Sequence, residues 1–187
     1  MRVPYISDPP PTSSEEDAAI IDRIRTRRHP RPLQPLDLAL LHSPPVADGW
    51  NSFLGAVRMR TIISDDIREL AISRVAVINR AWYEWMHHAP LAVRAGVSVE
   101  AMESIKEEGA LLRKGGKQEL FTDKQWAALV LADEMTRAVQ VSDHTMDWVK
   151  GLMSKREVVE LVATVGEWKQ HARLLGRFRP LLTLMVT

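Results

Sequence analysis

Helix-start signals constrain the fold of this chain more than any other feature. Three capping boxes, in which Ser or Thr is followed three residues later by Glu or Gln, begin at Ser13, Thr122 and Ser154. Each precedes a segment in which apolar residues recur every three or four positions, as on one face of a helix. No segment alternates polar and apolar residues as a half-buried strand does. The sequence therefore predicts an all-α helical bundle.

Other local signals predict where the individual helices lie. Ser64-Asp65-Asp66 is typical of an N-cap with an acidic first turn, and Gly96 is a natural residue just beyond a helix C-terminus. We expect helices over about 13–28, 36–42, 44–57, 64–79, 84–95, 98–109, 122–135, 144–152 and 154–179. Pro180 should end the last helix and leave an apolar tail over 181–186.

Length and charge limit the classes of protein that fit. The 187 residues suit one folded domain, which we place at 35–187, preceded by a proline-rich arm and a first helix over 1–34. Lys and Arg number 25 against 24 Asp and Glu, so no nucleic-acid partner is expected. The locally basic stretch 23–31 favours a solvated helix end or a subunit contact over a phosphate site.

The chain contains no cysteine, which excludes disulfides, thiolate metal sites and thiol-based catalysis. No apolar run reaches the roughly 18–20 residues that cross a bilayer, and the N-terminus lacks the apolar region of a secretory signal. We therefore expect a cytoplasmic protein without a membrane partner. The many apolar helix faces and the apolar tail predict a homo-oligomer.

The chemistry-bearing residues gather in one short segment. Glu84 lies three residues before His87 and four before His88, so on a helix both imidazoles lie near its carboxylate. Glu69, on the preceding predicted helix, could face the same site, and Tyr83 could donate a hydrogen bond there. Carboxylates beside a histidine can transfer protons. The alternative is an ordinary pair of Glu84 with His88 and an exposed His87.

Three further residues are candidates for substrate binding. Trp82 and Trp85 could line an apolar pocket, although aromatic residues at this spacing also serve as core. Arg74 lies in an apolar helical context and could bind an anionic substrate or form a structural ion pair. We interpret Asp133, Asp143 and His144 as caps or turn residues.

A metal site is not expected from the sequence. The Glu-x-x-His motif at Glu84 and His87 occurs in only one copy, whereas a di-iron bundle needs two copies and two more carboxylates. We therefore predict no metal, with one zinc or iron held by Glu and His side chains from two helices as the alternative.

Three segments carry a resemblance to a known family. Residues 68–79, 83–92 and 96–97 resemble the carboxymuconolactone decarboxylase-like family, whose superfamily includes the AhpD alkylhydroperoxidases. The Tyr-Glu-Trp-x-His-His block is the most specific part. A weaker likeness continues through Leu129-Ala132-Asp133 and Leu161-Val165-Gly166-Arg173, so the resemblance spans most of residues 35–178. It implies an all-α bundle that assembles as trimers or hexamers.

The resemblance also implies a set of active-site positions. Aligning the AhpD histidine with His88 puts the family glutamate on Glu69 and the two thiol positions on Ala81 and Glu84. Aligning instead the Asn-Arg of the lactone decarboxylases with Asn79-Arg80 puts the histidine on His87 and the glutamate on Tyr83. A thiol peroxidase is excluded under either alignment, because both thiols are absent.

The cysteine-free branch of the family implies a function. The lactone decarboxylases work without metal or organic cofactor, so we predict a lyase that acts by proton transfer on a small lactone or β-keto acid. A dehydratase, cyclase or isomerase on the same scaffold and a non-catalytic oligomeric binding protein remain alternatives. A further departure lies after Gly166, where Glu167, Trp168 and Lys169 replace the Asn and aromatic pair of many relatives.

Overall fold

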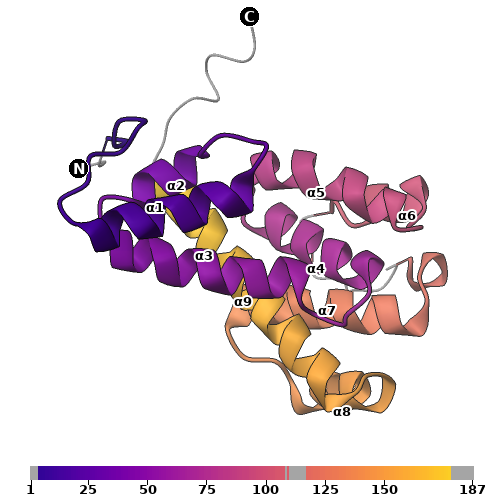
Figure 1. Ribbon diagram of the computed structural model, residues 1–187. Helices are drawn as coiled ribbons and strands as arrows, with labels where there is room; N and C mark the ends of the chain where they lie inside the picture. The colour runs from indigo at the N-terminus through magenta and orange to yellow at the C-terminus, as the bar shows by residue number, and fades with distance from the viewer. Residues whose placement is uncertain (1–3, 108, 110–116, 178–187) are drawn as a thin grey trace, which may run out of the picture. The chain divides into compact units, whose positions relative to one another are not determined.

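The computed structural model describes residues 4–107, 109 and 117–177, with side chains described as far as residue 170 (Figure 1). All regular elements of this part are helical, so the predicted all-α class is confirmed. The chain forms two compact units. The first unit consists of the N-terminal part of the chain, up to Arg60, and of the end of the last helix, from Leu174 onward. The second spans Thr61–Arg173. The boundary that we expect between residues 34 and 35 stays a prediction.

The first unit contains helices α1 (Glu15–Arg28), α2 (Pro35–Leu40) and α3 (Pro44–Met59). Helix α1 is capped by Ser14, whose side chain accepts a hydrogen bond from the Asp17 amide. The predicted cap at Ser13 is wrong by one residue, because the Ser13 hydroxyl instead donates to the Asp17 carboxylate at 2.6 Å. The core of this unit consists of apolar side chains: Ile20, Ile21, Ile24, Leu33, Leu36, Leu40, Leu41 and Ala47.

The basic stretch 23–31 is paired within this unit. Its ion pairs join Arg23 to Asp48 at 2.9 Å, Arg25 to Asp8 at 3.1 Å and Arg28 to Asp37 at 2.8 Å. The N-terminal arm lies on its own unit, since the Ile6 amide donates to the Leu38 carbonyl oxygen at 3.3 Å. The stretch therefore holds the arm and the helices together.

Helix α4 is the central element of the second unit. The helices of this unit are α4 (Asp65–Ile78), α5 (Trp82–Arg94), α6 (Val99–Ser104), α7 (Asp123–Ala138), α8 (Asp143–Leu152) and α9 (Lys155–Arg177), with a 3₁₀ turn at Gln118–Leu120. Helix α4 packs against both α5 and α7, as Figure 1 shows. Every residue from Glu69 to Val77 is buried, so charged side chains on α4 lie inside the protein.

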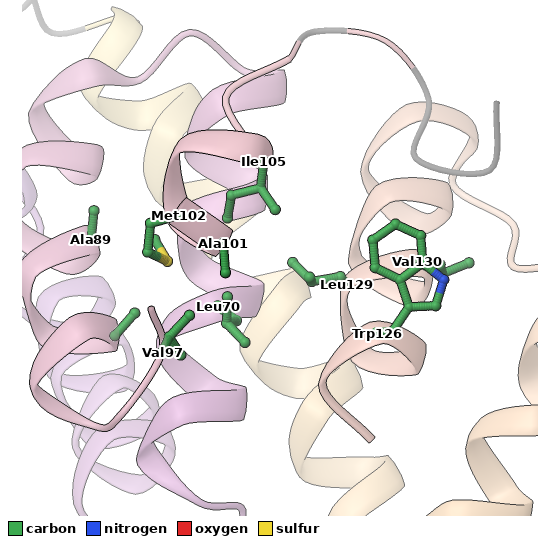
Figure 2. Close-up of a cluster of buried hydrophobic side chains, with 10 residues drawn as sticks. Leu70, Ala89, Val97, Ala101, Met102, Ile105, Trp126, Leu129 and Val130 are labelled. Carbon is green, nitrogen blue, oxygen red and sulfur yellow. The ribbon is translucent and has the colours of Figure 1, made fainter. Parts of the chain in front are cut away.

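One apolar cluster joins α4 to its neighbours (Figure 2). Leu70 of α4 packs with Ala89 and Ala92 of α5 and with Leu129 and Val130 of α7. The remaining members are Val97, Ala101, Met102, Ile105 and Trp126. Burial of such side chains stabilises the fold by about 25 cal/mol per Å² of apolar area. This packing fixes the facing sides of α4 and α5.

Most predicted helix ends agree with the structure. Thr122 and Gln125 form both hydrogen bonds of the predicted capping box at the start of α7. Helix α6 ends at Ser104, earlier than the expected end at Gly109, and the chain beyond it turns its carbonyl groups toward Arg74. Pro180 and the predicted apolar tail lie outside the described residues. Among the described helices, none is long and apolar enough to cross a membrane.

Candidate active site

His88 and Glu69 form a buried hydrogen-bonded pair across the α4–α5 interface. The distance from His88 Nδ1 to Glu69 Oε2 is 2.7 Å, and both side chains are less than 5% exposed. Apolar residues flank the pair on both helices, because Leu70 follows Glu69, Ala89 follows His88, and both belong to the apolar cluster. A carboxylate that accepts from Nδ1–H leaves the lone pair of the neutral ring on Nε2.

The second ring nitrogen of His88 points toward Glu84. The distance from Nε2 to Glu84 Oε2 is 3.6 Å, which is close enough for an ion pair but too long for a hydrogen bond. Glu84 is also buried and lies one helical turn before His88 on α5. The imidazole ring therefore has a carboxylate at each nitrogen, although only Nδ1 makes a direct hydrogen bond.

Two more side chains complete the surroundings of this ring. Trp168 of α9 meets His88 edge to face, with ring centroids 5.2 Å apart and planes at 86°. Arg68 contacts the other oxygen of Glu69 at 3.3 Å and pairs with Asp65 at 2.8 Å. We call Glu69, Glu84, His88 and Trp168 the His88 cluster. The sequence marked Trp168 only as a departure from relatives, and no local spacing linked it to His88.

His87 and Tyr83 lie on the exposed side of α5. His87 Nδ1 contacts the Tyr83 carbonyl oxygen at 2.8 Å, and the two rings are 4.4 Å apart. His88 is thus the buried histidine, and adjacent helical residues differ by about 100° in direction. His87 and Tyr83 thus contact each other on this side of the helix. This geometry fits the family alignment that uses His88.

The two tryptophans that we predict for substrate binding differ in their exposure and contacts. Trp82 is 45% exposed at the start of α5. Trp85 is half-buried and packs against the apolar cluster, with Lys106 Nζ 5.5 Å from its ring centroid. Trp85 therefore has the contacts of a residue at the edge of the core.

Arg74 forms a separate buried network. Its donors bind Asp133 Oδ1 through Nε and one terminal nitrogen, at 2.8 and 2.5 Å. The remaining bonds go to carbonyl oxygens of Ile105, Glu107 and Gly109 at 2.5–2.8 Å. These five bonds use all five N–H donors of a guanidinium group. The substrate-binding role for Arg74 is therefore replaced by the structural ion pair.

The partner carboxylate corrects another expectation. Asp133 is buried within α7 and is not a cap or turn residue; its second oxygen accepts from Arg137 Nε at 3.1 Å. Burial lowers the pKa of Arg74 from its ordinary value, whereas the Asp133 carboxylate acts in the opposite direction. We call Arg74, Asp133 and Arg137 the Arg74 cluster.

In the described part of the chain, no group of three or more His, Asp or Glu side chains is placed to hold a metal ion. The two residues of the Glu-x-x-His motif diverge, since Glu84 is buried and His87 is exposed. The arrangement of the His88 cluster is instead that of a histidine oriented by a carboxylate, which suits proton transfer.

Comparisons with known proteins agree with this architecture. Residues 44–119 match the carboxymuconolactone decarboxylase family. Through this segment the chain is similar to the carboxymuconolactone decarboxylase proteins, and it contains no cysteine. The matched segment is narrower than the range 35–178 over which we see the resemblance. Among curated proteins, no match to the chain was found.

Solved structures share the fold at low sequence identity. The debrominase Bmp8 without ligand has a TM-score of 0.67 at 13% identity, covering 88% of this chain and 87% of that chain. A cysteine-to-alanine variant of Bmp8 bound to 2,3,4-tribromopyrrole has a TM-score of 0.63 at 13% identity, covering 88% and 82%. A protein of unknown function from Agrobacterium tumefaciens, provisionally assigned to AhpD in antioxidant defence, has a TM-score of 0.61 at 17% identity, covering 75% and 92%. These likenesses establish the AhpD-like helical fold.

Proposed function

We propose that the protein is a cofactor-independent lyase of the decarboxylase type. It acts by proton transfer on a small cyclic oxygenated or carboxylated compound, such as a lactone or β-keto acid. The observation that carries this proposal is the buried imidazole of His88, which Glu69 holds at Nδ1 while Nε2 lies 3.6 Å from Glu84 Oε2, beyond hydrogen-bond distance. A ring fixed at one nitrogen can exchange a proton at the other. The match of residues 44–119 to the carboxymuconolactone decarboxylase family supports the same conclusion.

The reaction on a β-keto acid would use His88 as the proton donor. The bond between the α-carbon and the carboxylate breaks, carbon dioxide leaves, and the electron pair moves to the ketone oxygen to give an enolate. Protonated His88 then gives its Nε2 proton to the α-carbon, and water restores that proton afterwards. Glu69 stabilises the imidazolium before the transfer and holds Nδ1–H of the neutral ring after it, and Glu84 is the neighbouring group that can pass the proton from water to Nε2. One positioned proton-transfer group accelerates a reaction by roughly 10²–10⁴-fold.

Two other functions remain as alternatives: one would use the same residues for catalysis, and the other would keep them without catalysis. A dehydratase, cyclase or isomerase would take a proton at Nε2 and return it elsewhere without releasing carbon dioxide. A non-catalytic binding protein would keep the His88 cluster as a structural element. The Bmp8 variant binds 2,3,4-tribromopyrrole, which is a small cyclic compound. This ligand supports the proposal that the present chain also binds a small cyclic compound. A cysteine-dependent reaction is unavailable to this chain.

We also propose that a second copy of the chain covers the exposed face of α5. Its exposed apolar side chains are Trp82, Tyr83, Met86 and Val93. Association would remove this surface from water, as expected for the trimer or hexamer that the family implies. Light scattering on the purified protein measures the assembly directly, and a monomer would refute this part. A cytoplasmic location remains part of the same proposal.

The test of the catalytic proposal uses two assays on one panel of small cyclic compounds. Release of carbon dioxide is measured from cyclic β-keto acids. Deuterium exchange at the α-carbon of cyclic ketones and lactones is followed by proton NMR in D₂O. We expect His88→Ala and Glu84→Gln each to remove most activity while the circular dichroism spectrum stays helical. His144→Asn is the matched control, since this histidine is exposed on α8.

The outcomes separate the alternatives. Carbon dioxide release that depends on His88 supports the decarboxylase. Exchange without carbon dioxide release favours the isomerase-type alternative. Near-wild-type turnover in both variants would overturn the catalytic assignment, and absence of both reactions in the wild type favours the binding protein.

A further inference from the structure

Ser73 is a buried serine whose hydroxyl has no hydrogen-bond partner in the described part of the chain. Its side chain is fully buried on α4, and Oγ is shielded from solvent. It does not bond back to a carbonyl of the preceding turn, as helical serines often do. An unsatisfied buried hydroxyl destabilises the folded state, and alanine is the better helix former. Stability alone therefore favours alanine at position 73.

The helix register places Ser73 beside the His88 cluster. On α4, Ser73 lies four residues after Glu69, which puts the two side chains on one face. Two contacts fix how α4 runs against α5: Glu69 meets His88, and the Ala76 carbonyl oxygen accepts from the Ala81 amide at 2.8 Å. Both helices advance by seven residues between these two contacts. The helices are therefore antiparallel, and their register stays constant between the contacts.

This register puts Ser73 level with Glu84. Ser73 is four residues beyond Glu69 on α4, and Glu84 is four residues before His88 on α5. Since α4 packs on α5 and Glu69 meets His88, we infer that the face of α4 with Glu69 and Ser73 lies opposite the face of α5 with His88 and Glu84. On these faces Ser73 Oγ has no hydrogen-bond partner among the described residues, and His88 Nε2 lies 3.6 Å from Glu84 Oε2, beyond hydrogen-bond distance.

We propose that the Ser73 hydroxyl binds the carbonyl oxygen of the substrate, a role that rests on the proton-transfer function proposed above. When a proton or carbon dioxide leaves the α-carbon, the electron pair moves to that oxygen, and the enolate accepts a hydrogen bond from Ser73 Oγ–H. Ser73 keeps its own proton, and His88 Nε2 handles the proton at carbon. The substrate class is thereby narrowed to compounds whose carbonyl oxygen is next to the reacting carbon.

The test compares Ser73→Ala with a matched control. Thr136 of α7 carries the other buried serine or threonine hydroxyl without a partner in the described residues, and Thr136→Val removes it at similar volume. We expect Ser73→Ala to melt at or above the wild-type temperature while deuterium exchange slows about 10²-fold, mainly in kcat. Thr136→Val should keep the wild-type exchange rate. An unchanged exchange rate in Ser73→Ala would overturn the role of Ser73.

A binding measurement separates this inference from the proposed reaction. The probe is 4-nitrophenolate, whose single oxyanion resembles an enolate and whose absorbance responds to hydrogen bonding. We expect wild-type protein to bind it and Ser73→Ala to bind roughly 10-fold more weakly or worse. Binding that depends on Ser73 in a protein without exchange activity would support the oxygen site and refute the proposed reaction. Absence of binding, or equal binding by both proteins, would refute the oxygen site whatever the activity.

Discussion

Helix α4 carries two buried charged residues, Arg74 and Glu69, whose partners differ in how many of their hydrogen-bonding groups are occupied. Arg74 has all five guanidinium donors occupied by Asp133 and three carbonyl oxygens. Glu69, about one and a half turns earlier, binds a histidine that uses only one ring nitrogen in a direct hydrogen bond. A fully occupied charge can fix structure but has no donor left for a substrate. A partly occupied imidazole keeps a nitrogen for chemistry.

The cost of burying charge makes this difference informative. Two ions taken out of water recover the desolvation cost only when their geometry is good and their other donors and acceptors are also bonded. The Arg74 cluster meets this condition and ties the chain after α6 to α4 and α7. The His88 cluster meets it at Glu69 and leaves Nε2 of His88 opposite Glu84 beyond hydrogen-bond distance. We infer that the first cluster holds the fold, whereas the second is the site of the proposed reaction.

Removing the charge of Glu69 is the largest expected effect on the His88 side of this comparison. Glu69→Gln keeps the side-chain shape but no longer stabilises an imidazolium or fixes the ring tautomer. We expect exchange activity to fall roughly 10²–10⁴-fold with unchanged helicity. Nitrogen-15 NMR of the imidazole should show a changed tautomer population for His88, which a purely structural role would not require.

Asp65→Asn is the matched control for this change. Asp65 is the other carboxylate that pairs with Arg68, and its side chain is 73% exposed. We expect it to keep both activity and the His88 NMR signals. If Glu69→Gln stayed within threefold of wild type, the two clusters would have to be considered alike, both structural.

Breaking the Arg74 cluster should affect stability instead. Arg74→Met leaves the buried carboxylate of Asp133 without its main partner, and such a loss costs about 3–5 kcal/mol. Urea unfolding followed by circular dichroism measures this change. The double variant Arg74→Met/Asp133→Leu should recover a large part of the loss, because replacing a whole buried ion pair is often neutral. A single variant as stable as wild type would contradict the structural role.

Local signals made the helices of both regions predictable. The capping box of Thr122 and Gln125 forms as expected, because cap hydrogen bonds join residues three apart and depend little on the rest of the fold. The error at Ser13 has the same origin: Ser14 is an equally good cap, and sequence does not rank two adjacent serines. The all-α class followed from many such signals together.

Contacts between distant elements explain what could not be predicted. The side chains of Arg74 and Asp133 are 59 residues apart in sequence, so no spacing rule connects them. Trp168 reaches His88 from α9 for the same reason. The choice between His87 and His88 depends on which face of α5 packs on α4, and only the folded arrangement decides it. The proximity of Glu69 to the histidine was anticipated because consecutive helices commonly pack together.

An ion pair at the surface gives the smallest effect and completes the comparison. Glu157, at the start of α9, accepts from Lys124 Nζ at 2.7 Å and from the Ser154 amide at 2.8 Å. The hydrogen bond from Lys124, followed by those from Ser154, lowers the pKa of Glu157 to about 2. A depressed pKa stabilises the fold above the ordinary value near 4.5, and this contribution is lost as pH falls from there toward 2.

We expect Glu157→Gln to lower the free energy of unfolding by no more than about 1 kcal/mol at pH 7, because the pair is partly exposed and screened by water. The difference between variant and wild type should shrink as pH falls below about 4.5 and nearly vanish near pH 2. Urea unfolding at pH 7 and at pH 3, each in low and high salt, measures both dependences. The prediction would be contradicted if Glu157→Gln lowered the free energy of unfolding as much as Arg74→Met does, or by an amount independent of pH. The exposed ion pair would then contribute to stability as a buried one does.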